Sequence, residues 1–288
     1  MSAGPYDALL IMSFGGPEGM SDVMPFLDNV LRGRNVPEER KREVAHHYEL
    51  FGGVSPLNLQ NRQLQAALAA ELERLGLDLP IYVGNRNWHP YVADAIAQMQ
   101  RDGVKKFLTF VTSGFSCYSG CRQYREDIAR ALGAAGEGAP ASDKIRVYYN
   151  HPLFIETTRR HWAQASQRLP ADQRAEAVTL FTAHSIPGAM AAGSDYEVQL
   201  REASRLTAEA AGIANWQLVF QSRSGPPSQP WLEPDVCDTL RALHGQGVKA
   251  VVLVPIGFIS DHMEVLYDLD REAKELAQEL GMTLVRAA

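Results

Sequence analysis

Apolar residues occur along the chain in two alternating patterns. Short runs rich in β-branched and aromatic residues predict strands, and longer stretches with apolar residues at every third or fourth position predict helices. The predicted strands are Ala8–Met12, Ile81–Val83, Phe107–Val111, Ile145–Tyr149, Val178–Thr182, Gln217–Gln221, Ala250–Val254 and Thr283–Val285. The predicted helices are Ser21–Leu31, Asn58–Leu75, Val92–Asp102, Gly120–Leu132, Phe154–Gln167, Tyr196–Ala211, Pro234–His244 and Glu264–Leu280. This alternation is typical of α/β proteins with parallel sheets.

The pattern also indicates two halves of similar design without a sequence repeat. A length of 288 residues corresponds to roughly two domains of about 150 residues each. Glycine and alanine are concentrated between Gly133 and Asp143, which indicates a long loop or the edge of a first half, and Tyr149–Pro152 is the natural hinge into a second. We therefore expect an N-terminal half over residues 1–150 and a C-terminal half over residues 151–288.

Composition and charge narrow the class of protein. Apolar residues at 45% and charged residues at 22% are ordinary for a soluble globular protein. The 28 basic and 34 acidic residues give a net charge of −6, which repels phosphate backbones, so we expect no nucleic acid partner. The apolar stretch Ala250–Ile259 is shorter than the roughly 18 residues of a membrane span, and Met1–Asp7 lacks the basic start of a signal peptide. We expect a cytoplasmic protein without a transmembrane segment.

The chain has three cysteines, Cys117, Cys121 and Cys237, which are too few to cross-link a fold of this size. The spacing of Cys117 and Cys121 can bring two thiols together on a helical turn. A zinc or iron–sulfur site, however, needs about four ligands. We therefore expect structural cysteines in a reducing compartment.

One histidine stands where ligands commonly bind in parallel sheets, beyond the carboxyl end of a strand. His184 follows the predicted strand Val178–Thr182 closely and precedes Ser185-Ile186-Pro187, where the chain turns. Its imidazole could face a ligand, or it could be a hydrogen-bonded structural residue. Position alone does not decide between these two interpretations.

Three carboxylates form a row further along the chain. Glu264, Asp268 and Glu272 are four residues apart, so one helix would carry them on one face at steps of about 6 Å. They could form a solvated acidic face, with Arg271 and Lys274 as neighbours. Glu264, however, opens its helix just after an apolar strand, where we expect it to be partly buried. Oxygen ligands leading to an imidazole would suit a divalent metal such as Fe²⁺.

Two other segments carry weaker signals. The glycine pair after the first strand, within Ser13–Glu18, does not match a known phosphate-binding pattern. A basic stretch with a local charge of +3 contains five cations against Glu38 and Glu39, and these cations are Arg32, Arg34, Arg40, Lys41 and Arg42. Such a stretch is usually a solvated face, but beside a ligand it would attract carboxylates.

Taken together, these segments resemble the ferrochelatase family, whose members insert Fe²⁺ into a porphyrin. The resemblance covers nearly the whole chain. Its most specific motifs are Thr179–Pro187, Gln221–Asp235, Val254–Phe258 and Asp261–Asp268, supported by Phe14–Glu18, Gly52–Leu57 and Asn87–Pro90. The resemblance implies two similar Rossmann-like halves of the chelatase type, with parallel sheets around a central cleft, and a last helix that could pack back on the first half.

The resemblance also implies roles for individual residues. His184 and Glu264 would be the catalytic pair that binds the incoming iron, with His184 as the base for the pyrrole protons, and Asp268 and Glu272 would extend the metal path. The residues implied in porphyrin binding are Phe14, Arg32, Arg34, Tyr48, Ser55 and Tyr124. Some relatives have an iron-ligating tyrosine where this chain has Phe14, which offers no ligand atom.

The substrates implied are Fe²⁺ and a porphyrin. The Arg32-Gly33-Arg34 segment is similar to the lip of members that use coproporphyrin III, whose four propionates suit a basic rim better than the two of protoporphyrin IX. We expect no prosthetic group and no iron–sulfur cluster, because no cysteine follows Cys237. A downstream enzyme of haem synthesis is a candidate partner. Two alternatives stay open, a cobalt chelatase of the same fold and a non-catalytic haem- or metal-binding carrier.

Overall fold

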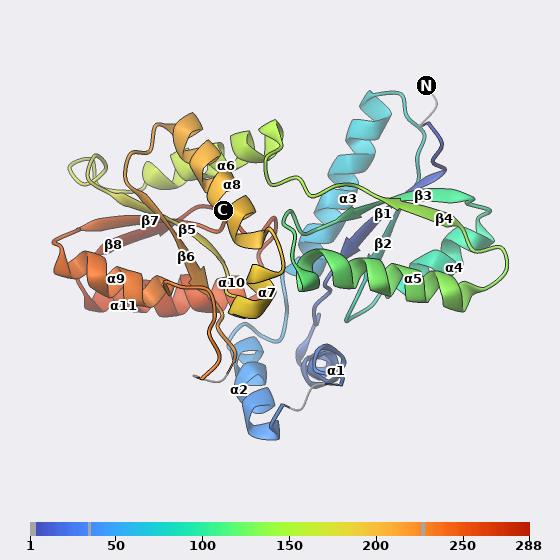
Figure 1. Ribbon diagram of the computed structural model, residues 1–288, viewed down its shortest axis with the longest axis horizontal. Coiled ribbons are helices and arrows are strands. Elements are labelled where there is room, and N and C mark those ends of the chain that lie inside the picture. The colour runs from blue at the N-terminus through green and yellow to red at the C-terminus, as the bar shows by residue number, and fades with distance from the viewer. Residues whose placement is uncertain (1–3, 34–35, 226–227) are drawn as a thin grey trace. The chain divides into compact units, whose positions relative to one another are not determined.

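The computed structural model describes residues 4–33, 36–225 and 228–288. The chain falls into two compact units, each built around its own four-stranded parallel sheet (Figure 1). Unit 1 comprises Met1–Ser113, Cys121–Arg146 and Ser260–Met263, and unit 2 comprises Gly114–Gly120, Val147–Ile259 and Glu264–Ala288. The α/β class with parallel sheets is therefore confirmed.

The sheet of unit 1 has the strand order β2-β1-β3-β4. Its strands are β1 (Ala8–Ser13), β2 (Ile81–Asn85), β3 (Lys106–Val111) and β4 (Ala141–Lys144). Its helices are α1 (Met20–Val30), α2 (Glu38–Glu49), α3 (Leu57–Arg74), α4 (Val92–Arg101) and α5 (Gln123–Ala135), and the π-helical segment η1 (Tyr118–Arg122) precedes α5. Every residue of β1 is buried, because strands cover both its edges and side chains pack on both its faces, which explains its continuous apolar sequence.

The sheet of unit 2 repeats this order as β6-β5-β7-β8. Its strands are β5 (Val178–His184), β6 (Trp216–Gln221), β7 (Ala250–Val254) and β8 (Thr283–Arg286). Its helices are α6 (Pro152–Ser166), α7 (Gly188–Ala192), α8 (Tyr196–Ala211), α9 (Val236–Gly245), α10 (Met263–Tyr267) and α11 (Lys274–Glu279), and the π-helical segment η2 (Asp268–Ala273) joins α10 to α11. The core on one face of this sheet contains Phe181, Phe220 and Val252, all almost fully buried.

A close backbone approach fixes the carboxyl end of β5. Gly257, which follows β7, donates its N–H to the carbonyl of Thr182 at 3.1 Å. A Cβ atom added to Gly257 would lie 2.7 Å from the Cβ of Ala183, so only glycine lets the loop after β7 pack this closely. The residue after Ala183 is His184, and its position therefore depends on this contact.

Two predicted elements differ from the structure, and one helix of the basic stretch was not predicted. Ile145–Tyr149 is not a strand, because the last strand of the first sheet is β4, whose polar sequence fits a sheet edge paired only with β3. Tyr149, at the end of this segment, packs its ring instead beside the ring of Phe115. The predicted helix Glu264–Leu280 is divided by η2 into three segments. The basic stretch contains an unpredicted helix, α2, of which only Ala45 is buried.

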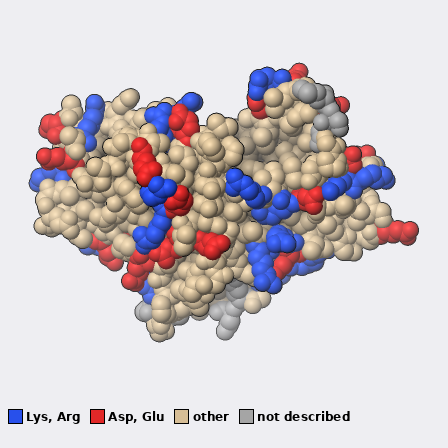
Figure 2. Space-filling view, turned by 45° about the horizontal axis from the view of Figure 1, so that its top comes forward, with Lys and Arg blue, Asp and Glu red and all other residues tan. Residues whose placement is uncertain are grey.

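Surface charges are interspersed rather than grouped by sign on the face shown in Figure 2. Many belong to ion pairs along one helix, such as Arg205 with Glu202 and Glu209 on α8. Within the described parts of the chain, no helix has the length and hydrophobicity needed to cross a membrane. The cytoplasmic location stays a prediction.

Candidate active site

His184 is the last residue of β5, and its backbone is held on two sides. The N–H of Ser185 donates to the carbonyl of Gln221 on the neighbouring strand β6 at 2.7 Å. The buried hydroxyl of Tyr196, at the start of α8, donates to the carbonyl of His184 at 3.1 Å. These contacts fix the backbone, while the imidazole is 30% exposed and can meet a ligand.

The two nitrogens of the His184 ring have different partners. Nδ1 lies 2.5 Å from the carbonyl oxygen of Ser185, and because a carbonyl only accepts, we assign a proton to Nδ1. Nε2 lies 3.3 Å from Oε2 of Glu264. In the neutral ring Nε2 therefore carries the lone pair, which can bind a cation or accept a proton next to a carboxylate.

The surroundings of His184 favour its protonated form. Burial lowers the pKa of the imidazole, but the charge and hydrogen bond of Glu264, the carbonyl of Ser185 and the charge of Asp268 together raise the pKa to about 9. Without a metal the ring is thus protonated at neutral pH. A cation bound between His184 and Glu264 would replace this proton on Nε2.

Glu264 is about half exposed. It is the second residue of α10, between the buried residues Met263 and Val265, and 53% of its side chain is exposed. The side chain is therefore partly covered, as expected, and solvent can reach its carboxylate.

Asp268, the first residue of η2, contacts two residues at the end of β6. Its Oδ2 accepts a hydrogen bond from the hydroxyl of Ser222 and lies 3.4 Å from Nε2 of Gln221. Burial raises the pKa of Asp268 to about 7; Ser222 opposes this shift, and the charges of Glu264 and Glu272 add to it. Asp268 therefore gains or loses a proton near neutral pH.

Glu272 lies within η2 and continues the row. Burial raises its pKa, and Asp235 and Glu275 raise it further. Within the described residues, no three His, Cys, Asp or Glu side chains converge on one metal position. The pair of His184 and Glu264 offers a cation two donor atoms, Nε2 and Oε2, which lie 3.3 Å apart.

Two of the residues predicted to bind porphyrin belong to one aromatic cluster of unit 1. Phe14 directly follows β1 and is 38% exposed. Its ring meets Phe26 edge to face at 6.2 Å, and Phe26 meets Tyr48 in the same way at 5.8 Å. Trp88 packs against the other side of this cluster, 6.2 Å from Phe26. Phe14 and Tyr48 thus both pack against a buried aromatic ring, and their contact with porphyrin stays a prediction.

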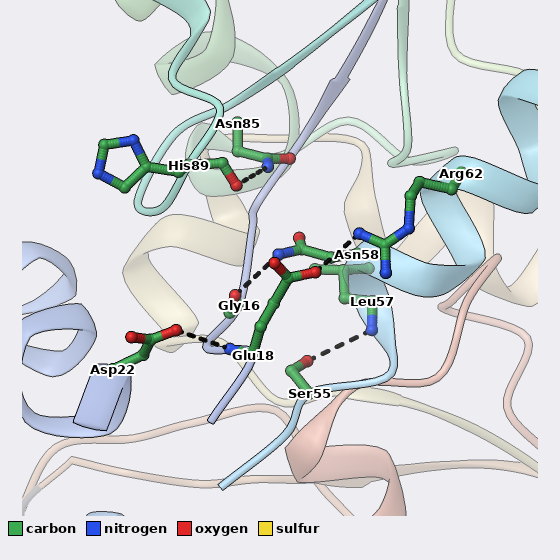
Figure 3. Close-up of polar contacts among 9 residues, drawn as sticks. All are labelled: Gly16, Glu18, Asp22, Ser55, Leu57, Asn58, Arg62, Asn85 and His89. Atoms are coloured by element: carbon green, nitrogen blue, oxygen red, sulfur yellow. Dashed lines mark hydrogen bonds and ion pairs between the residues drawn. The ribbon is translucent and has the colours of Figure 1, made fainter. Parts of the chain in front are cut away.

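Ser55 and Tyr124 are both buried, with 4% and 5% of their surface exposed. Figure 3 shows that Ser55 Oγ accepts from the N–H of Leu57 at 3.4 Å, where α3 begins. Gly16 lies against it, and a Cβ added there would be 2.5 Å from the Cβ of Ser55. The ring of Tyr124 lies beneath the guanidinium of Arg86 at 4.9 Å. Both side chains are thus built into unit 1, and their contact with porphyrin stays a prediction.

The basic stretch is mostly paired with acidic residues. Arg32 is exposed and donates to Oδ1 of Asn29 at 2.5 Å, and Arg34 lies outside the described residues. On α2, the ion pairs are Lys41 with Asp28 and Glu38, Arg40 with Glu43, and Arg42 with Glu38. Arg32 is thus the candidate propionate ligand that the structure describes.

The structure adds contacts of residues that the sequence analysis gave no role. Gln221 and Ser222, which belong to the motif Gln221–Asp235, both contact Asp268. Tyr196, which no motif singled out, donates to the carbonyl of His184. Arg86, just after β2, forms a nearly buried ion pair with Asp127 at 2.5 Å. All three cysteines are free, and burial raises the pKa of Cys237 to about 12, so this thiol is protonated at neutral pH.

The sequence is similar to named relatives over almost its whole length. It is 58% identical to a ferrochelatase of Rhodopirellula baltica over 285 residues, which cover 99% of this chain and 81% of the relative. It is 55% identical to a coproporphyrin III ferrochelatase of Nocardia farcinica, over 98% of this chain and 82% of the relative. A coproporphyrin III ferrochelatase of Streptomyces coelicolor is 51% identical over 100% of this chain and 82% of the relative.

Solved structures agree on the fold. SirB from Bacillus subtilis with Fe³⁺ superimposes with a TM-score of 0.58 at 10% sequence identity, over 96% of this chain and 86% of SirB. DR2241 from Deinococcus radiodurans, described as structurally similar to chelatases, gives a TM-score of 0.52 at 14% identity, over 98% of this chain and 50% of that protein. The predicted chelatase-type fold is thereby confirmed. The profile of the ferrochelatase family matches residues 6–288, and the chain belongs to this family.

Proposed function

We propose that this ferrochelatase inserts Fe²⁺ into coproporphyrin III, with His184 and Glu264 as the residues that receive the iron. The observation that carries the proposal is the pair itself, with Nε2 of His184 3.3 Å from Oε2 of Glu264 at the carboxyl end of a parallel strand. Relatives named for this activity are similar over nearly the full chain, which supports the reaction class.

The reaction requires the porphyrin to lose two pyrrole protons while Fe²⁺ loses bound water and gains four nitrogen ligands. Fe²⁺ between His184 and Glu264 displaces the proton that these residues share, because a cation and a proton compete for the same lone pair. Once the iron moves to the porphyrin, Nε2 is a neutral base beside an anion and accepts a pyrrole proton. Its raised pKa makes this transfer favourable.

The acidic row supplies the route for ions. Asp268 has a pKa of about 7, so it exchanges protons with solvent near neutral pH and can relay those leaving His184. Glu272 extends the row away from Asp268. Together the carboxylates attract Fe²⁺ and offer it oxygen ligands that it can exchange. No prosthetic group takes part in this proposal.

Coproporphyrin III is proposed over protoporphyrin IX because of charge. Its four propionates would gain more from Arg32, and from a second arginine two positions further along the sequence, than two propionates would. The aromatic cluster around Phe26 offers an apolar contact for the ring system. An enzyme of haem synthesis that acts on the iron-coproporphyrin product is the proposed downstream partner.

Anaerobic turnover tests the proposal. The protein is mixed with excess coproporphyrin III and Fe²⁺, and the loss of the free-base absorption bands is followed. We expect many equivalents of product per protein, formed faster than with protoporphyrin IX and faster than with Co²⁺. Conversion that stops at one equivalent would indicate a carrier, and faster Co²⁺ insertion would indicate a cobalt chelatase.

A further inference from the structure

Ser222 has a backbone conformation that non-glycine residues rarely adopt. Among the described residues it is the one non-glycine residue with a positive φ, at 62°. This left-handed region costs free energy for residues with a Cβ, and such residues persist mainly where function requires them. Glycine would fit here without that cost, so the serine side chain calls for an explanation.

The left-handed turn brings the Ser222 hydroxyl to the acidic row. Ser222 directly follows β6, and its hydroxyl donates to Oδ2 of Asp268. Gln221, only 1% exposed, places Nε2 3.4 Å from the same oxygen and 3.5 Å from the carbonyl oxygen of Glu264. Gln221 is also the register partner of His184 across the sheet. Residues at the end of β6 thus contact the carboxylate of Asp268 and the backbone carbonyl of Glu264, and they lie beside His184 in the sheet.

We infer that Ser222 is a positioning residue, which holds the Asp268 carboxylate in one orientation for the transfer of Fe²⁺ to His184 and Glu264. The inference rests on the proposed function and extends it to a residue outside the predicted site. A carboxylate fixed through one oxygen keeps the other oriented for a passing ion, and a freely rotating carboxylate does not. The backbone of residue 222 has a positive φ in the conformation that makes this contact.

The decisive variant is Ser222→Gly, which removes the hydroxyl and relieves the backbone strain together. We expect a melting temperature equal to or above that of the wild type, a roughly tenfold rise in KM for Fe²⁺, and a KM for porphyrin within about twofold of the wild type. Ser224→Gly, at an exposed serine two residues further along the same loop, is the matched control and should change neither KM. An unchanged KM for Fe²⁺ in Ser222→Gly would overturn the inference.

A double variant tests whether Ser222 acts through Asp268. In the Asp268→Asn background, Ser222→Gly should cause no further rise in KM for Fe²⁺, because the carboxylate it positions is already absent. If each substitution raised KM for Fe²⁺ independently, so that the two rises multiplied in the double variant, the inference would be contradicted.

Equilibrium dialysis of Fe²⁺ without porphyrin separates this inference from the proposed function. If the wild type binds Fe²⁺ and Ser222→Gly binds it roughly tenfold more weakly, Ser222 positions a metal ligand whether or not the protein turns over. If both bind equally, the inference fails even when the wild type is an active ferrochelatase.

Discussion

The strands β1 and β5 occupy the same place in the two sheets but end in different chemistry. In unit 1 the last paired residues are Ser13 and Asn85, both uncharged and almost fully buried, and the exposed ring of Phe14 follows. In unit 2 the last paired residues are His184 and Gln221, and the carboxylates of α10 and η2 lie beside them. The same topology thus presents an aromatic surface in one unit and ionisable groups in the other.

Under the proposed function, the two strand ends would have different tasks. Binding a flat apolar ligand needs area and shape, which a cluster of rings provides. Moving a metal ion and protons needs groups that can change charge, and His184 and Asp268 are ionisable groups whose pKa values are shifted to about 9 and about 7. Substitutions in each unit test this division.

The largest effect is expected from His184→Ala. Loss of the base and metal ligand should lower kcat for Fe²⁺ insertion by at least about 100-fold, while porphyrin binding, measured by fluorescence quenching, stays unchanged. The control is His244→Ala, at an exposed histidine in the last turn of α9. A fully active His184→Ala enzyme would remove the chemical distinction between the two strand ends.

The next effect concerns the charge on His184. Glu264→Gln removes the main attraction that favours the protonated ring, while burial remains, so the pKa should fall from about 9 to about 6.5 or below. An NMR titration of the His184 ring measures this change. Glu275→Gln, which alters an exposed partner of Arg271, should leave the His184 titration unchanged. A pKa that stays near 9 in Glu264→Gln would show that the pair is not coupled.

A smaller effect concerns stability and pH. The pKa of Asp268 is raised from 3.8 to about 7, so the folded protein binds this proton more tightly than the unfolded chain. The stabilising contribution is complete below pH 4 and is lost as the pH rises through about 7. Asp268→Asn should therefore raise the melting temperature at pH 8 by several degrees, at roughly 2 °C per kcal/mol for a chain of this length, and leave it unchanged at pH 4. Equal shifts at both pH values would refute the assignment.

The smallest effect is expected in unit 1. Arg32→Ala should raise KM for coproporphyrin III by about threefold and leave KM for protoporphyrin IX nearly unchanged, because one exposed charge contributes little. Arg74→Ala, at the end of α3, is the control, since Arg74 pairs only locally with Glu71. Equal losses for both porphyrins would argue against propionate recognition by Arg32.

Much of the fold was predictable from local pattern, because buried strands such as β7 are continuously apolar and helices such as α8 have a regular apolar face. The helix α2 was missed because only Ala45 on it is buried, so it carries no apolar period. The edge strand β4 was misplaced because its residues are polar.

The site was predictable in part. His184 and Glu264 were singled out by position and by resemblance, and the structure places them side by side. The contacts of Ser222 depend on a left-handed backbone and on a helix more than 40 residues further along the chain, and no local pattern encodes these. The π-helical segment η2 was not predicted either. The four-residue spacing of Glu264, Asp268 and Glu272 is compatible with an α-helix and with a π-helix, so it does not distinguish the two.

The segment η2 makes the candidate active site sensitive to the number of residues in the helix that carries Glu264 and Asp268. A π-helical turn contains one residue more than the α-helix needs, so it acts as an insertion absorbed within a continuous helix. Deleting one residue there would restore α-helical bonding and rotate Glu264 and Asp268 by about 100° relative to α11. The helix would survive such a deletion, but the carboxylates would no longer face Ser222 and His184. Deletion of a single codon in η2 would therefore leave the protein folded but without the proposed metal site.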